Sequence, residues 1–196
     1  MDTISVDPKP IWQTAWFRSL GWLPLIFFIA RAVEYVQVGT PSQVLWMCHL
    51  SNLMLAVGLF LANPFVIRVA VLLLIFGVPP WAVEMAVSRL VTPVSIASHL
   101  GGTIVGLIVI AKVGAKPRIW APSWALYIVV QLICRLTTRP ELDINNAHRI
   151  YSIWKDTFSS YWQYWPIATL VVGISMWVFE FGLLKLFPRE AQKSTA

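Results

Sequence analysis

The chain has 196 residues, of which 58% are hydrophobic and 12% charged, and its mean hydropathy is +0.69. This composition excludes an ordinary soluble domain and predicts an integral membrane protein. The formal net charge of +6 could indicate nucleic-acid binding, but the basic residues are spread over the ends of apolar segments and form no Lys/Arg run. We therefore assign this charge to membrane topology and lipid headgroups, and we expect no nucleic-acid partner.

Six apolar runs follow one another along the chain, separated by short polar connections. They predict an all-α, polytopic membrane protein in which residues 1–196 form a single transmembrane domain, a six-helix transmembrane bundle. A double proline, Pro79 and Pro80, is expected to bend or break the third helix, because each proline removes a backbone hydrogen bond. The six runs cover roughly residues 22–38, 44–61, 65–87, 93–113, 120–136 and 166–186.

Two segments outside these runs are expected to form short interfacial helices at the membrane surface. In the N-terminal segment, 1–20, bulky apolar residues recur every four positions from Trp12 onward, a pattern too short to span a bilayer. The outer connection, 137–164, shows the same spacing from Ile150 onward. We expect a short amphipathic helix in this connection to cover one mouth of the bundle.

The distribution of basic residues predicts the orientation. Six spans place both termini on the same side, together with the second and fourth connections between spans. That side carries nine Lys and Arg residues and the other side five, with Arg31 left out because it lies within a span. The excess predicts that both termini are cytoplasmic.

A polar group opens the second apolar run. Cys48 and Asn52 are four residues apart, and His49 and Asn52 are three apart, so in a helix all three lie on one side. Unpartnered polar groups in hydrocarbon cost several kcal/mol each, so this side should face the protein interior.

The predicted topology brings further polar residues to the same outer depth and predicts one polar pocket in the outer half of the bundle. Structural interpretations remain open for each member: a small buried residue for Cys48, a hydrogen-bonding link between helices for His49 and His99, and an ion pair with Glu34 for Arg31. Besides Cys48, His49 and His99, the expected pocket contains Asn52, Ser51, Ser95, Glu84, Arg31 and Gln131 as substrate-binding residues.

A cysteine and a histidine are the minimal set for nucleophilic acyl transfer. Cys48 would be the nucleophile and His99 the base, while His49 and Asn52 could orient the base or bind the carbonyl oxygen. A pocket one to two turns below the headgroups lies at the depth of phospholipid ester linkages. The sequence therefore predicts an enzyme that acts on lipid acyl esters, with membrane lipids as partners and without a cofactor or a metal.

Three strings resemble the transmembrane protein 164 family and its bacterial YwaF-type relatives: LWMCHLSNLMLAVGLFLANP, SHLGG followed by a basic turn, and YWQYWPI before the last span. The resemblance extends from about residue 22 to residue 186. It implies a lipid acyltransferase or, through the more distant androgen-induced hydrolases, a lipid-ester hydrolase. By position it implies that Cys48 is the nucleophile and His99 the histidine. The cysteine precedes the histidine here, whereas it follows in the bacterial string, so Ser51 is the alternative nucleophile.

Two other classes of function fit the same residues. His49 and His99 could clamp a haem or, with Cys48 and Glu84, bind a metal. Alternatively, the chain could be a non-enzymatic transporter or assembly subunit in which the proline-containing third span moves.

Overall fold

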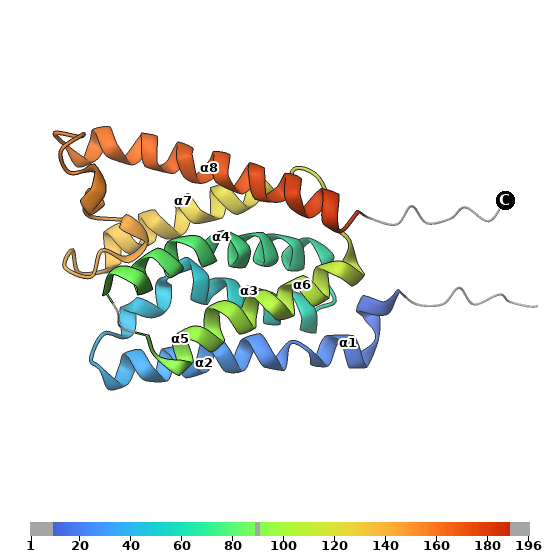
Figure 1. Cartoon of the computed structure of the whole chain (residues 1–196). Helices are drawn as coiled ribbons and strands as arrows, with labels where there is room; N and C mark the ends of the chain where they lie inside the picture. Colours follow the sequence, from blue (N-terminus) through green and yellow to red (C-terminus); the bar gives the residue numbers. More distant parts are fainter. Residues whose placement is uncertain (1–9, 89–90, 189–196) are drawn as a thin grey trace, which may run out of the picture.

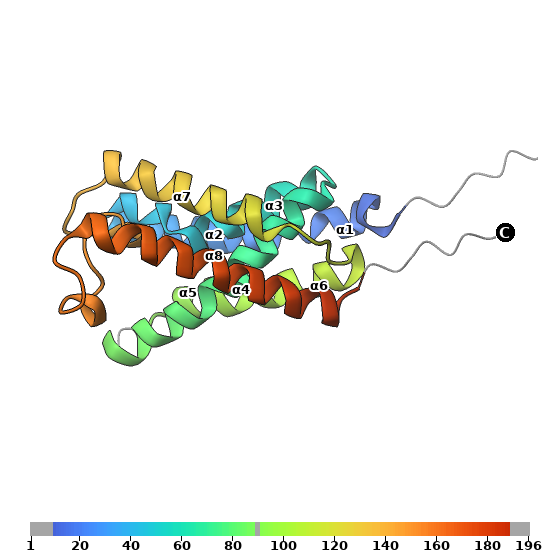
Figure 2. The same cartoon turned by 90° about the horizontal axis from the view of Figure 1, so that it is seen from above.

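The computed structural model describes residues 10–88 and 91–188, and these residues form helices and turns but no strand. The helices lie along a common axis in an elongated bundle (Figures 1 and 2). The α-helices are α1 (Ala15–Ser19), α2 (Trp22–Gln37), α3 (Met47–Phe60), α4 (Pro64–Ser88), α5 (Pro93–Ile96), α6 (Gly102–Val113), α7 (Trp120–Thr137) and α8 (Tyr161–Leu186). Between them lie the 3-10 turns η1 (Ile11–Gln13), η2 (Pro41–Leu45), η4 (Ile144–Asn146) and η5 (Ser152–Trp154), and a π-helical segment, η3 (Ala97–Gly101).

Four stretches of the described chain are long and apolar enough to cross a membrane: Ala15–Gln37, Pro64–Val87, Pro93–Val113 and Tyr161–Leu186. Large apolar side chains remain about half exposed along the last of these, including Leu170, Ile174 and Phe181. An apolar surface of this extent is unfavourable in water and is normal against lipid tails. The all-α prediction is confirmed, and the chain is a helical membrane protein.

The third apolar run forms one uninterrupted helix, α4, through Pro79 and Pro80. The expected break is therefore absent. Beyond the prolines, Trp81 donates a hydrogen bond from Nε1 to Ser95 Oγ at 2.9 Å and stacks on the ring of His99. These contacts hold the last part of α4 against the neighbouring span.

The N-terminal segment does not lie across the end of the bundle as expected. Helix α1 continues the direction of α2, and only Leu20 and Gly21 separate the two (Figure 1). Phe17 is buried, and the Nε of Arg18 donates to the carbonyl of Phe60 at 2.8 Å. A side chain at position 21 would come within 2.9 Å of the Phe60 ring, so glycine permits this close contact. Helix α1 is thus the first part of the span Ala15–Gln37.

The outer connection also differs from the prediction. Instead of an amphipathic helix over residues 150–158, it contains only the short 3-10 turns η4 and η5. Asp143 organises its first part, because its carboxylate accepts hydrogen bonds from the N–H groups of His148 and Arg149 at 2.8 and 3.0 Å. Burial raises the pKa of this carboxyl above its ordinary value, and the two N–H bonds oppose the shift.

Asn145 joins this connection to the start of α3. Its Oδ1 accepts from the N–H of Met47 at 2.9 Å, and its Nδ2 donates to the carbonyl of Leu45 at 2.9 Å. The Nε2 of Gln131 donates to the carbonyl of Asn145 at 3.0 Å. Asn145 has a positive φ of 55°, a conformation that asparagine tolerates better than most residues. One loop side chain therefore caps a helix that lies about 100 residues earlier in the chain.

At the opposite end of the bundle, a buried carboxylate caps α7. Glu180 of α8 is 6% exposed and accepts hydrogen bonds from the N–H groups of Arg118 and Trp120 at 2.9 and 2.6 Å. These groups lie at the positively polarised start of α7, where an acidic side chain is favourable. At the same end of the bundle, Arg68 donates hydrogen bonds to the carbonyls of Val113, the last residue of α6, and Gly114.

Replacing Glu180 by leucine should lower the free energy of unfolding by about 2 kcal/mol, because two partly buried N–H groups lose their charged acceptor. Thermal unfolding of the purified protein in detergent micelles measures the effect. Glu180→Gln is the matched control: it keeps one acceptor oxygen and should lose clearly less stability. A leucine variant as stable as the original chain would contradict the capping role.

Candidate functional site

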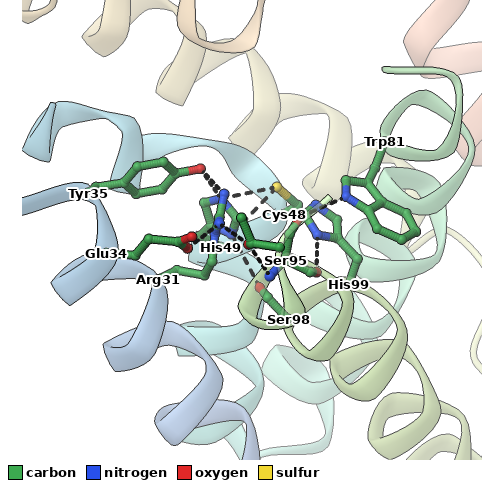
Figure 3. A network of polar contacts seen from close by, with 10 residues as sticks. Arg31, Glu34, Tyr35, Cys48, His49, Trp81, Ser95, Ser98 and His99 are labelled. Carbon is green, nitrogen blue, oxygen red and sulfur yellow. Dashed lines mark hydrogen bonds and ion pairs between the residues drawn. The ribbon is translucent and has the colours of Figure 1, made fainter. Parts of the chain in front are cut away.

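The side chains of Cys48, His49 and His99 meet inside the bundle (Figure 3). The Sγ of Cys48 and one ring nitrogen from each histidine all lie within 4.8 Å of one another. His49 is 1% exposed and His99 6%, whereas Cys48 is partly exposed. The structure thus brings together the three residues that the sequence marked as catalytic.

Cys48 lies in the first turn of α3, where backbone N–H groups have no partner within the helix. Its neighbours are satisfied from outside: Met47 N–H by Asn145, and His49 and Leu50 N–H by the carbonyl of Trp46. Within the described residues, the N–H of Cys48 makes no hydrogen bond to another residue. The thiol lies beside this N–H and that of His49, at the positively polarised end of a helix.

His99 belongs to the π-helical segment η3, which interrupts the helix running from Pro93 to Val113. The wider turn changes the helical register locally, and the adjacent residues Ser98 and His99 are both buried beside α3. π-helical turns of this kind occur frequently at functional sites.

Side chains with hydrogen-bonding groups surround both ring nitrogens of His49. Arg31 donates to the hydroxyl of Tyr35 and also pairs with Glu34. The Tyr35 hydroxyl lies 3.0 Å from His49 Nε2, and Ser98 Oγ lies 3.3 Å from Nδ1. The Sγ of Cys48 lies 3.8 Å from Nδ1 and 3.9 Å from Nε2. Both nitrogens of His49 are therefore engaged by neighbouring side chains.

His99 has the complementary arrangement. Its Nδ1 lies 2.9 Å from the carbonyl oxygen of Ser95, which can only accept, so Nδ1 carries the proton. The Nε2 lone pair makes no hydrogen bond within the described part of the chain. Trp81 stacks on the ring at a centroid distance of 4.7 Å and an interplanar angle of 11°, and in Figure 3 the ring lies between Trp81 and Cys48. His99 is therefore the histidine with a free basic nitrogen.

Asn52 and Ser51 have structural contacts. The amide nitrogen of Asn52 donates to the carbonyls of Cys48 and Ser98 at 3.0 and 3.1 Å, which uses both of its N–H bonds. Asn52 thus joins α3 to η3 and has no N–H left for a substrate. The Ser51 hydroxyl is fully buried and donates to the carbonyl of Met47 at 2.6 Å, facing the helix rather than the cluster.

Four other predicted residues fall into three groups. Ser95 supports His99 through its carbonyl, and Arg31 reaches the cluster through Tyr35. Glu84 is exposed on α4 and takes no part in the network around Cys48. Gln131 belongs to a separate network, in which it accepts a hydrogen bond from the indole of Trp165 at 2.8 Å. The single pocket expected from the sequence is therefore two networks, joined by Asn145 at the start of α3.

Three residues of the site escaped the sequence analysis: Tyr35, Ser98 and Trp81. Tyr35 could have been found, because it lies four residues after Arg31 and thus on the same helix face. Ser98 could have been found in the same way, because it lies three residues after Ser95. Trp81 could not, since its place depends on the continuation of α4 past its prolines.

Comparisons with protein-family models, with curated proteins and with solved structures find no match to this chain. The chemistry of the site therefore has to be inferred from its own geometry. Two cavities described on the molecule lie away from Cys48: a void of about 10 Å³ beside Arg68 and Glu180, and a groove of about 320 Å³ between α7 and α8.

Gly102→Ala should disrupt the junction between α3 and η3. A Cβ at this position would lie 2.2 Å from Asn52 Oδ1, so the amide would have to leave the carbonyls of Cys48 and Ser98. Overpacking of this kind should lower the free energy of unfolding by about 2 kcal/mol, measured by thermal unfolding in micelles. Gly182→Ala is the control, because nothing lies within 4 Å of a Cβ there. Equal stability of the two variants would refute the proposed junction.

Proposed function

We propose that this chain is an integral membrane enzyme acting on lipid acyl esters, an acyltransferase or hydrolase, with Cys48 as nucleophile and His99 as base. One observation carries the proposal: the sulfur of Cys48, in the first turn of α3, lies within 4.8 Å of a histidine whose Nδ1–H is held by a carbonyl. That hydrogen bond leaves Nε2 of His99 free to take a proton.

The reaction follows from these groups. Nε2 of His99 takes the thiol proton, and the thiolate forms a bond to the ester carbonyl carbon. The carbonyl electron pair moves to oxygen and returns as the bond to the leaving alkoxide breaks. The alkoxide takes the proton from Nε2, and the acyl group remains on Cys48 as a thioester. Water or an acceptor hydroxyl then gives its proton to Nε2, attacks the thioester and restores the thiol.

The start of α3 supplies stabilisation for the negative charge of this sequence. The unengaged N–H of Cys48 is a donor for the oxyanion that forms on the attacked carbonyl. The polarity of the helix N-terminus favours the negative charge of the oxyanion. His49 holds the cluster in place through Tyr35 and Ser98, without giving up a proton.

We further propose that six elements cross the bilayer, with both termini cytoplasmic and the site in the outer half. Helices α3 and α7 have 14 and 18 residues and are about 21 and 27 Å long. They are short for the full hydrocarbon thickness, but η2 lengthens the α3 segment and the connections pack over both ends. Described residues near both ends of the chain, in η1 and after α8, lie at the same end of the bundle (Figure 1). This arrangement supports an even number of crossings.

The lipid substrate is supported by two features. Cys48 lies in the first turn of α3, which we place at the depth of phospholipid ester linkages, and it is the least buried member of the cluster. The resemblance of the LWMCHLSNLMLAVGLFLANP and SHLGG strings to the transmembrane protein 164 family and its YwaF-type relatives points to the same chemistry.

A lipid-like thiol-reactive probe should label the purified protein at Cys48. Cys48→Ala should abolish labelling, and His99→Gln should slow it about a hundredfold, because the thiol loses its base. Cys134→Ala is the matched control: Cys134 is fully buried, bonded to Asn145 and distant from the cluster, so its loss should leave labelling unchanged. Labelling that survives both Cys48→Ala and His99→Gln would end the acyl-enzyme proposal.

Metal binding is the second function that a specific observation favours, since the three ligand atoms within 4.8 Å match a Cys–His–His set. The Nδ1–H of His99 bonded to a carbonyl is also typical of metal-ligating histidines. Against this, His49 would have to release Tyr35 or Ser98. A haem is disfavoured, because Trp81 stacks on the ring of His99, and the side chains of Tyr35 and Ser98 lie at the two ring nitrogens of His49.

Elemental analysis of the purified protein distinguishes the two proposals. The acyl-enzyme proposal predicts thiol labelling without bound zinc. A metal centre predicts about one zinc ion per chain, lost in both Cys48→Ala and His99→Ala, and thiol labelling only after chelation.

A further inference from the structure

A wholly apolar groove lies between α7 and α8, far from Cys48. Its volume is about 320 Å³, and it is lined by Trp120, Trp124, Leu170, Gly173, Ile174 and Trp177. Trp177, Leu170 and Ile174 are 52–55% exposed, so the groove opens to the outside of the bundle. Figure 2 shows the two helices next to each other, with α7 beginning at the end where α8 finishes.

The floor of the groove is fixed by a contact between the two helices. The indole nitrogen of Trp124 donates to the carbonyl of Thr169 at 2.7 Å. A Cβ on Gly173 would come within 3.1 Å of the same indole, so glycine at this position allows the ring to pack closely against α8. The groove is therefore formed before any ligand enters, which lowers the entropic cost of binding.

One end of the groove is bordered by positive charge. Arg118 precedes Trp120 by two residues, and Lys112, Lys116 and Arg118 are all exposed. Glu180, the acidic residue at this end among those that the structure describes, is buried and accepts hydrogen bonds from the N–H groups of Arg118 and Trp120. The carboxylate of Glu180 thus points to the start of α7, while the side chains of Lys112, Lys116 and Arg118 are exposed. An apolar slot with a basic border complements a lipid with an acidic headgroup.

We propose that this groove binds one acyl chain of an acidic membrane phospholipid, whose phosphate contacts Lys116 and Arg118. The three tryptophans supply large rigid apolar surfaces for the chain, and the border supplies the preference for negative charge. The start of α7, which carries the basic border, lies at the opposite end of the bundle from the start of α3 (Figure 1), and the site does not depend on the chemistry of Cys48.

Native mass spectrometry of the whole chain in detergent, titrated with phosphatidylglycerol or phosphatidylcholine, tests the proposal. Phosphatidylglycerol should bind more tightly, and exchanging both cations in Lys116→Glu/Arg118→Glu should weaken it at least about tenfold. Leu170→Trp fills the groove and should weaken both lipids. Val171→Trp is the matched control, because Val171 is the next residue, is 49% exposed and does not line the groove.

Three outcomes would overturn the proposal: equal binding of both lipids, no effect of the charge exchange, or equal effects of Leu170→Trp and Val171→Trp. A fourth would replace it: if Leu170→Trp changes the oligomeric state and leaves lipid binding unchanged, a second copy of the chain occupies the groove. The charge-exchange variant alters only exposed side chains of a connection, so it gives an answer even if the groove-filling variant fails to fold.

Discussion

The arrangement of this bundle depends on the satisfaction of backbone polar groups at helix ends that lie in or near hydrocarbon. Water cannot reach these groups freely, so side chains from distant segments provide their partners. Asn145 does so at the start of α3, Glu180 at the start of α7 and Arg68 at the end of α6. Each of these contacts joins elements far apart in the chain. Together they fix the positions of the helices along their axes as well as the lateral packing between them.

The same constraint gives the two histidines different surroundings. The Tyr35 hydroxyl, the Ser98 hydroxyl and the Cys48 sulfur lie at the ring nitrogens of His49. His99 is held through Nδ1 by the carbonyl of Ser95, and its Nε2 makes no hydrogen bond within the described residues. Two similar side chains thus differ in how many of their ring nitrogens are engaged by neighbours.

The sequence was sufficient for the helices but not for all their contacts. Long apolar runs and their Pro, Gly and polar ends predict the helix boundaries closely, and the spacing of Cys48 and Asn52 correctly indicates an inward face. The amphipathic spacing from Ile150 onward was misleading. The connection forms tight turns instead of a helix, and Asp143 and Asn145 hold these turns by hydrogen bonds. The predicted depth in the membrane also placed Gln131 in the same pocket as His99. Depth does not say which side of a helix faces which neighbour, and Gln131 instead contacts Asn145.

The π-helical segment has a consequence for the whole fourth span. Residues before Ala97 and after Gly101 belong to two helical halves whose side chains are out of phase with each other. Residues that follow Pro93 at the α-helical spacing of three or four positions therefore do not stay on one face of the helix when the row is continued into α6. Ser95 and Gly102, seven residues apart, would share one face of an undistorted helix, so the wider turn between them shifts the two halves relative to each other. A sequence alteration that restored regular winding would therefore change which residues of this span face the interior and which face the lipid.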